Sequence, residues 1–93
     1  MRVRYYIGPE TDEPHIHGHR VSEAEVEDVL GRSLEDRPGT GGSRVALGQS
    51  RAGRYLRVIY VPDVDPGSIF VVTAYDLGAK ARRALARRLR KRR

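Results

Sequence analysis

Three histidines occur at alternate positions in one short stretch of the chain, and they are its only histidines. His15, His17 and His19 lie between an acidic segment and a helix-start signal. In a β-strand, residues two apart project from the same side, so this spacing could hold a zinc or nickel ion. A tight metal site, however, takes ligands from separate elements, and no fourth ligand is evident. We therefore expect no metal and no small-molecule cofactor, and we consider acid–base chemistry instead.

Histidine can take up or release a proton near neutral pH, as RNA cleavage by the 2′-hydroxyl requires. That reaction needs a base for the hydroxyl proton, cations for the phosphate and an acid for the leaving oxygen. His19 is the best-placed candidate, because it stands just before a helix start, where anions are favoured. Arg57 is a second candidate, although it can also be an ordinary solvated or salt-bridged residue of its strand. All the candidates that could converge on one phosphate are His19, Arg44, Arg57, Tyr75, Lys80 and Arg83.

The most apolar part of the chain, residues 54–77, must position these side chains. Two runs rich in Val, Ile, Tyr and Phe flank a loop with two prolines, two aspartates and a glycine, which predicts an antiparallel pair of strands. Residues 44–49 alternate in polarity and precede a tight turn, so they extend the pair to a three-stranded meander. Residues 2–7 predict a short edge strand. Residues 32–43 are rich in glycine and predict a flexible connector.

Two helices are expected beside this sheet. Ser22 and Glu25 form the pattern of a capping box, so a helix should run from there to about Leu30, with Gly31 as its left-handed end. The second helix should begin at Leu77 with Asp76 as its cap. Its apolar positions recur at helical spacing and its basic residues lie along the flanks.

Charge is distributed very unevenly along the chain of 93 residues, whose net charge is +6. All twelve acids lie at or before Asp76, whereas nine of the eighteen Lys and Arg residues lie from Lys80 onward. Residues 1–76 therefore carry −3 and the last seventeen residues carry +9. Such a tail attracts polyanions, which favours RNA, DNA, the ribosome or an acidic protein as partner. The side chains expected to bind RNA there are Arg82, Arg87, Arg88 and Arg90.

Composition restricts the class of protein further. The length indicates one domain, 1–93, with residues 77–93 as its basic helix and tail. The chain contains no cysteine, which removes disulfides and thiolate metal sites. Because no apolar run approaches the roughly 20 residues of a membrane span, we expect a cytoplasmic protein without a membrane partner.

Several short motifs in a distinctive order resemble one known family. They are His19-Arg20-Val21-Ser22-Glu23-Ala24-Glu25-Val26, Arg44-Val45-Ala46-Leu47-Gly48, Gly53-Arg54-Tyr55-Leu56 and Val72-Thr73-Ala74-Tyr75-Asp76-Leu77, followed by Lys80 and Arg82-Arg83. This order is similar to that of the BrnT-like branch of the RelE superfamily, the ribonuclease toxins of bacterial type II toxin–antitoxin systems. The resemblance covers most of residues 15–83. It implies a compact α+β fold with an antiparallel sheet, metal-independent RNA cleavage and neutralisation by a cognate antitoxin protein.

The resemblance also assigns positions. His19 matches the histidine of the family's His-Gly-Val-Ser/Thr motif, and Arg44 matches an arginine that opens a central strand. Lys80, Arg82 and Arg83 match basic positions of the last helix. Arg20 stands where the family usually has glycine. Tyr75 stands where arginine is common, and a tyrosine there can donate a hydrogen bond or a proton.

Taken together, these features predict an α+β protein with a small antiparallel meander of three or four strands, a helix in its N-terminal half and a basic C-terminal helix. The function expected is that of a toxin acting as an endoribonuclease on RNA, in association with the ribosome or without it. The alternatives are a non-catalytic RNA- or ribosome-binding module and a protein-interaction module whose basic tail binds an acidic partner.

Overall fold

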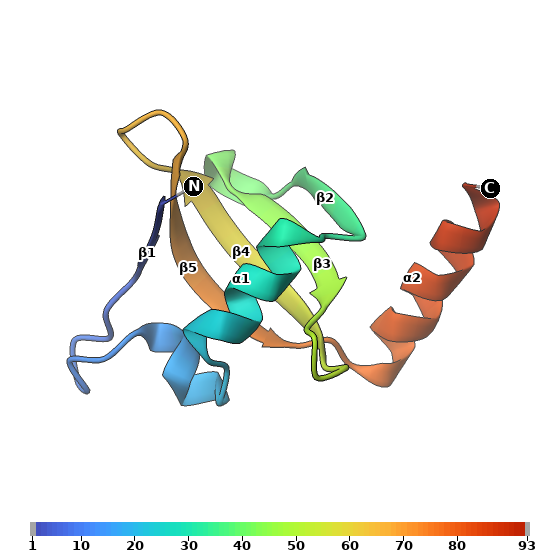
Figure 1. Ribbon diagram of the computed structural model, residues 1–93, viewed down its shortest axis with the longest axis horizontal. Coiled ribbons are helices and arrows are strands. Elements are labelled where there is room, and N and C mark those ends of the chain that lie inside the picture. The colour runs from blue at the N-terminus through green and yellow to red at the C-terminus, as the bar shows by residue number, and fades with distance from the viewer. Residues whose placement is uncertain (1, 93) are drawn as a thin grey trace.

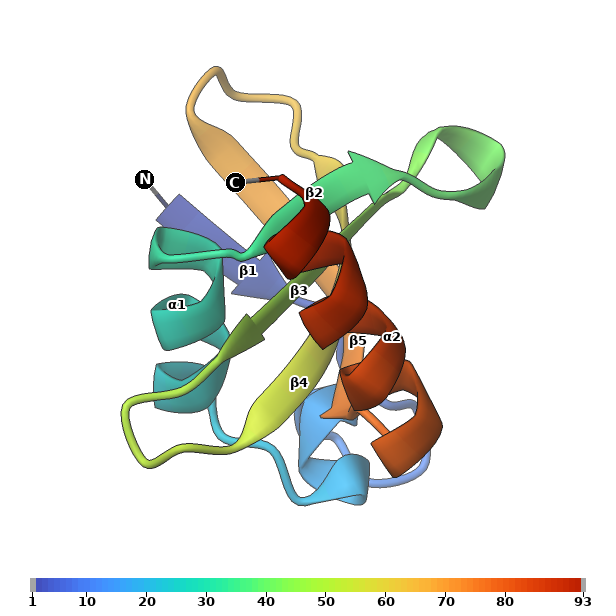
Figure 2. The same cartoon turned by 90° about the vertical axis from the view of Figure 1, so that its right-hand side faces the viewer.

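A five-stranded mixed β-sheet with a helix packed on each face forms the fold (Figure 1). The computed structural model describes residues 2–92. The strand order in the sheet is β1-β5-β4-β3-β2. In the side view of Figure 2, α2 lies in front of the sheet. The elements are β1 (Arg2–Tyr5), η1 (a 3-10 helix, His15–His19), α1 (Glu23–Gly31), β2 (Glu35–Pro38), η2 (a 3-10 turn, Thr40–Gly42), β3 (Arg44–Gln49), β4 (Tyr55–Pro62), β5 (Ser68–Asp76) and α2 (Ala79–Lys91).

The predicted α+β class and the antiparallel meander β3-β4-β5 are confirmed. The sheet is larger than predicted, because it has five strands rather than three or four, and it is mixed. The expected edge strand β1 pairs in parallel with β5, from Arg2 opposite Ser68 to Tyr5 opposite Val71. Two parallel strands are joined by a long crossover and not by a tight turn, so no local turn sequence predicts their pairing.

Residues 32–43 are not the flexible connector that the glycines suggested. They contain β2, which pairs antiparallel with β3 from Glu35 opposite Leu47 to Pro38 opposite Arg44. The strand has no apolar alternation to reveal it, since its sequence is Glu-Asp-Arg-Pro. It is fixed by backbone pairing and by Glu35, which is buried and bound by arginines.

Helix α1 covers one face of the sheet. The predicted capping box is confirmed, because the Ser22 hydroxyl accepts from the Glu25 amide at 3.2 Å and the Glu25 carboxylate accepts from the Ser22 amide at 3.0 Å. Gly31 belongs to the helix itself, and Arg32 forms its C-cap without a left-handed residue. The core on this face is formed by Ile16, Val21, Val26, Val29, Ala46, Leu56, Val58, Val71 and Ala74.

Close contact between α1 and β3 depends on Gly48. A Cβ atom at this position would lie 3.1 Å from Cγ1 of Val29 and 3.6 Å from the carbonyl oxygen of Arg32. A side chain there would force Val29 to shift by a few tenths of an ångström, so glycine suits this close packing.

Helix α2 packs on the opposite face, over a smaller core of Leu47, Leu77 and Leu85. Ala81 and Leu89 add to this contact, as their helical spacing predicted. The helix begins later than expected: Gly78 is its N-cap and makes no side-chain cap bond. Asp76 is the last residue of β5 rather than a cap, and its carboxylate binds Arg54. Both carboxylate oxygens of Asp76 bind Arg54 and do not cap the amides at the start of α2.

A register shift in β5 decides which side chains face α2. Ile59 pairs with Thr73 but Tyr60 pairs with Val71, so Val72 is an extra residue in β5. The simple alternation expected for this strand therefore fails at Val72. Beyond the shift, Thr73 and Tyr75 share the α2 face with Arg57, because Arg57 is paired with Tyr75.

Within residues 2–92, neither helix combines the length and the apolar character needed to cross a bilayer.

Candidate functional site

A histidine, a tyrosine and an arginine meet where β5 ends beside η1. The rings of His19 and Tyr75 lie 5.7 Å apart between centroids. The guanidinium carbon of Arg57 lies 5.8 Å from the centre of the Tyr75 ring. We call His19, Tyr75 and Arg57 the central cluster. It combines a proton carrier, a phenol and a cation, which are the groups that phosphate chemistry requires.

Two polar atoms beside this cluster are buried without a hydrogen-bond partner among residues 2–92. They are Nε of Arg57 and Oγ1 of Thr73. Both residues lie on the same face of neighbouring strands, since Ile59 is opposite Thr73 and Arg57 is opposite Tyr75. Arg57 also has no ion-pair partner within the described part of the chain. Buried polar atoms left without a partner are rare, so these two atoms single out this face of the sheet.

The three histidines do not share one side. They lie in the 3-10 helix η1, not in a strand, so the alternation of a strand does not apply to them. The rings of His15 and His19 are 5.4 Å apart in an edge-to-face arrangement. His17 turns away, and its Nε2 lies 2.6 Å from a carboxylate oxygen of Glu23. Residues 2–92 contain no group of three His, Cys, Asp or Glu side chains placed to hold a metal ion.

His15 thereby becomes a second histidine next to the central cluster, which sequence reasoning did not select. Its ring also lies 5.9 Å from the Tyr6 ring. The signal that could have identified it is the spacing of His15 and His19 read as one helical turn instead of a strand. Pro14 and Gly18, which flank and interrupt the histidines, were compatible with such a turn.

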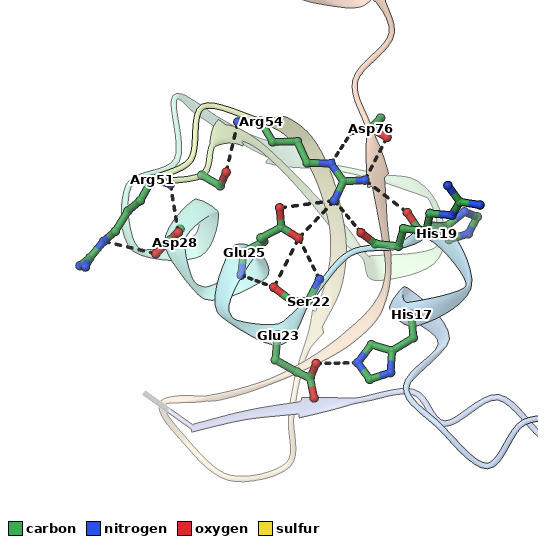
Figure 3. A network of polar contacts seen from close by, with 11 residues as sticks. His17, His19, Ser22, Glu23, Glu25, Asp28, Arg51, Arg54 and Asp76 are labelled. Carbon is green, nitrogen blue, oxygen red and sulfur yellow. Dashed lines mark hydrogen bonds and ion pairs between the residues drawn. The ribbon is translucent and has the colours of Figure 1, made fainter.

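Arg54 fixes the position of η1 relative to the end of β5 (Figure 3). Its Nη1 donates to the carbonyl oxygen of Arg20 at 2.6 Å, and its Nη2 donates to that of His19 at 3.3 Å. Its Nε and Nη2 also bind the two carboxylate oxygens of Asp76 at 2.7 and 3.0 Å. Asp76 follows Tyr75 directly. One guanidinium therefore holds the backbone beside both His19 and Tyr75.

The same arginine joins α1 to this arrangement. Arg54 Nη1 lies 3.1 Å from Oε1 of Glu25, the acid of the capping box (Figure 3). Hydrogen bonding by Arg54 holds the pKa of Asp76 below its usual range, and Asp76 in turn raises the pKa of Arg54. Arg20 adopts a left-handed conformation with φ 59°, which its carbonyl bond to Arg54 helps to hold. No spacing pattern marked Arg54 in the sequence, because its partners are distant in the chain.

Arg44 does not join the central cluster. It pairs with Tyr60 across the strands, and its Nε binds Oδ1 of Asp36 at 2.7 Å. The Asp36 hydrogen bond raises the pKa of Arg44. Tyr60 packs against the core beneath α1, so Arg44 lies on the other face of the sheet from Arg57. Arg44 opens β3, as the resemblance predicted, but no contact in residues 2–92 joins it to the central cluster.

The basic residues of α2 divide into two groups. Arg88 binds Glu35 through two hydrogen bonds of 2.7 and 2.9 Å, and Arg92 binds the same carboxylate at 3.1 Å. Arg88, an expected RNA ligand, is thus occupied within the fold. The exposed basic side chains of α2 without an ion pair in residues 2–92 are Lys80, Arg82, Arg83, Arg87, Arg90 and Lys91.

A groove of about 300 Å³ runs between α2 and the sheet. Arg82 and Arg83 line it, and the guanidinium carbon of Arg82 lies 5.8 Å from the centre of the Tyr55 ring. Tyr55 precedes Arg57 by two residues in β4, so both face α2. The groove therefore lies on the sheet face that also carries Arg57, although Arg57 does not line it. No hydrogen bond, ion pair or ring contact in residues 2–92 ties Lys80 or Arg83 to the central cluster.

Comparison with known proteins finds no family model, no curated protein and no solved structure that matches this chain. The resemblance to BrnT-like toxins therefore stays a prediction from sequence motifs. The chemistry of the site has to be inferred from its own geometry.

Proposed function

We propose that the chain is a ribonuclease of the toxin type, which cleaves RNA at the central cluster without a metal ion. The observation that carries the proposal is Arg57, an arginine with a buried Nε that has no acceptor in residues 2–92 and stands against Tyr75 and His19. A phosphodiester supplies the missing acceptor. Most buried arginines of structural importance are paired instead, as Arg54 and Arg88 are in this fold.

The proposed reaction is attack of an RNA 2′-hydroxyl on its own 3′-phosphate. A histidine of the pair His15 and His19 removes the hydroxyl proton, and the oxygen forms a bond to phosphorus. The bond from phosphorus to the 5′-oxygen then breaks, and that oxygen receives a proton from Tyr75 or the other histidine. The products are a 2′,3′-cyclic phosphate and a free 5′-hydroxyl. Arg57 and the Thr73 hydroxyl stabilise the charge that develops on the phosphate oxygens.

The exposed cations of α2 guide RNA to this site in the same proposal. Lys80, Arg83, Arg87 and Arg90 contact the phosphate backbone, while Arg82 lines the groove between α2 and Tyr55. Contacts of this kind provide affinity that falls with salt and carry no sequence information. The toxin acts in the cytoplasm, and a cognate antitoxin covers the site until it is removed.

Expression in bacteria tests the proposal. The intact chain should stop growth, and co-expression of the product of the neighbouring gene should restore it. His19→Ala and Arg57→Met should abolish the growth arrest, whereas Arg44→Met should retain it, because Arg44 lies on the other face of the sheet. Normal growth with the well-folded wild-type chain would contradict a toxin. RNA binding that survives all three substitutions without cleavage would favour the non-catalytic RNA-binding alternative.

A further inference from the structure

A second groove opens next to His15. Its volume is about 380 Å³, which lies in the range of small-molecule sites. We call it the N-terminal groove. The residues that matter for its chemistry are Tyr6, Pro9, Glu10, Glu13, Pro14 and His15.

Aromatic rings and prolines form part of the walls of the N-terminal groove. Tyr6 is 41 % exposed although it is large and apolar, and its ring lies 5.9 Å from that of His15. Two prolines add further flat surface. Unpaired nucleobases stack on such aromatic rings, and every base has a face suited to this contact.

The groove is also preformed. The backbone of residues 6–15 folds back on itself, because the His15 amide donates to the Tyr6 carbonyl at 2.8 Å and the Gly8 amide donates to the Glu13 carbonyl at 2.8 Å. Asp12 closes the turn with a left-handed backbone, φ 58°. A ligand that enters the groove therefore does not need to order the loop first.

Two acids make this groove unlike the cationic groove beside α2. Glu10 and Glu13 line it, and neither has an ion-pair partner within residues 2–92. Ionised carboxylates repel phosphate and only accept hydrogen bonds, so an occupant must present N–H donors. Guanine presents two adjacent donors on one edge, N1–H and the N2 amino group. Adenine, cytosine and uracil each place an acceptor beside their donor, which a carboxylate would repel.

We propose that the N-terminal groove is a guanine subsite that selects where RNA is cut. This inference rests on the proposed function and adds its substrate preference. The His15 ring borders the groove and lies 5.4 Å from the His19 ring, so a base in the groove places its own 3′-phosphate toward the central cluster. Cleavage then follows an unpaired guanine. Tyr6 stacks on the base, and Glu10 and Glu13 accept its two N–H groups.

Binding of uncleavable nucleotides tests the subsite apart from catalysis. The probes are guanosine 3′-monophosphate, inosine 3′-monophosphate, which lacks only the N2 amino group, and adenosine 3′-monophosphate. Calorimetry should give an affinity for the guanosine nucleotide about tenfold higher than for the other two. Tyr6→Ala should weaken binding of all three, whereas Glu10→Gln and Glu13→Gln should remove the preference for guanosine.

Asp12→Asn is the matched control. It makes the same change of charge in the same loop, it does not line the groove, and asparagine tolerates the left-handed backbone. Binding and preference should stay within about twofold of the wild-type values. Equal affinity for guanosine and inosine nucleotides would overturn the guanine subsite.

Cleavage assays separate this inference from the proposed function. Cleavage of RNAs with and without unpaired guanine at equal rates would overturn the subsite but leave the ribonuclease intact. Selective guanosine binding that the groove variants abolish, in a chain that cleaves no RNA, would support the subsite and contradict the ribonuclease.

Discussion

Arg54 shares its guanidinium among two carboxylates and two carbonyl groups. These bonds join the end of η1, the start of α1 and the end of β5 (Figure 3). The backbone carbonyl of His19 and the carboxylate of Asp76, which follows Tyr75, are held at once. We infer that Arg54 is a positioning residue for the central cluster, which it does not itself touch.

Loss of this guanidinium should cost stability because it leaves the partly buried Glu25 carboxylate and the more exposed Asp76 carboxylate unpaired. For Arg54→Met we expect a decrease of about 2 kcal/mol in the free energy of unfolding. Urea denaturation followed by circular dichroism measures it. The control is Arg51→Met, whose ion pair with Asp28 is 85 % exposed on the arginine side, and which should change stability by less than about 0.5 kcal/mol. Equal effects of the two substitutions would contradict the role given to Arg54.

Replacing Thr73 should raise the stability of the fold and lower its activity. Its hydroxyl oxygen is buried without a partner in residues 2–92, so the isosteric Thr73→Val removes an unsatisfied group. We expect an increase in stability of about 1 kcal/mol together with slower RNA cleavage. Thr40→Val, at an exposed position of η2, should affect neither quantity. A destabilised Thr73→Val would show that the hydroxyl has a structural partner.

At the residue scale, sequence reasoning selected His19, Tyr75 and Arg57, which the fold brings together, and Arg44, which it keeps apart. The motif order supplied His19 and Tyr75. Arg54 and the buried hydroxyl of Thr73 could not be found, because they depend on contacts between residues distant in sequence and on a register shift at Val72.

Helix α2 is held to the sheet by a small core and one buried acid. Glu35 is 5 % exposed and binds Arg88 and Arg92. The Arg88 hydrogen bonds lower the pKa of Glu35 below its usual value. Because the pKa is lower in the folded state, this acid adds stability above its ordinary pKa. That contribution is lost as the pH falls through the folded-state pKa.

Glu35→Gln tests this attachment. We expect the variant to be less stable than the wild type by about 2 kcal/mol at pH 7, because the arginines lose their carboxylate. The difference should shrink as the pH falls below about 4.3, because the Glu35 carboxyl then becomes protonated in the unfolded chain and, at still lower pH, in the folded chain. Thermal unfolding from pH 7 to pH 3 measures both. A difference that stays constant over this range would contradict the ion-pair clamp.

At the element scale, locally encoded features were predicted well. The capping box of α1 and the β3-β4-β5 meander arise from residues adjacent in sequence, and both are confirmed. The strand β1 was predicted as an edge strand, but its parallel pairing with the distant β5 could not be deduced from periodicity. The strand β2 was missed because its sequence is polar and shows no apolar alternation. Asp76 was assigned as a helix cap because aspartate favours that position. Its actual partner, Arg54, lies 22 residues earlier in the chain and could not be recognised from local sequence.

On the scale of the whole molecule, positive charge is concentrated on the exposed side of α2. If RNA follows this side, Arg83→Gln with Arg87→Gln should lower the salt dependence of binding. The slope of log K against log salt should fall by about 1.4, or about 0.7 for each lost single-strand phosphate contact. Fluorescence anisotropy with a short RNA over a range of salt measures this slope.

The matched control removes two exposed arginines elsewhere, Arg32→Gln with Arg51→Gln. Both lie on the α1 side of the molecule, near the end of that helix and in the turn after β3. The net charge falls by the same amount, yet the slope should stay unchanged. Equal slopes for the two double variants would mean that RNA binding follows net charge and not a defined surface.

The central claim is that His19, Tyr75 and Arg57 form one RNA-cleaving site. It is tested most directly by incubating the purified chain with a defined RNA in the presence of EDTA and analysing the ends of the fragments. We predict 2′,3′-cyclic phosphate and 5′-hydroxyl ends, formed by the wild type and by Arg44→Met but not by Arg57→Met. Intact RNA with the wild-type chain, or equal cleavage by Arg57→Met, would contradict the claim.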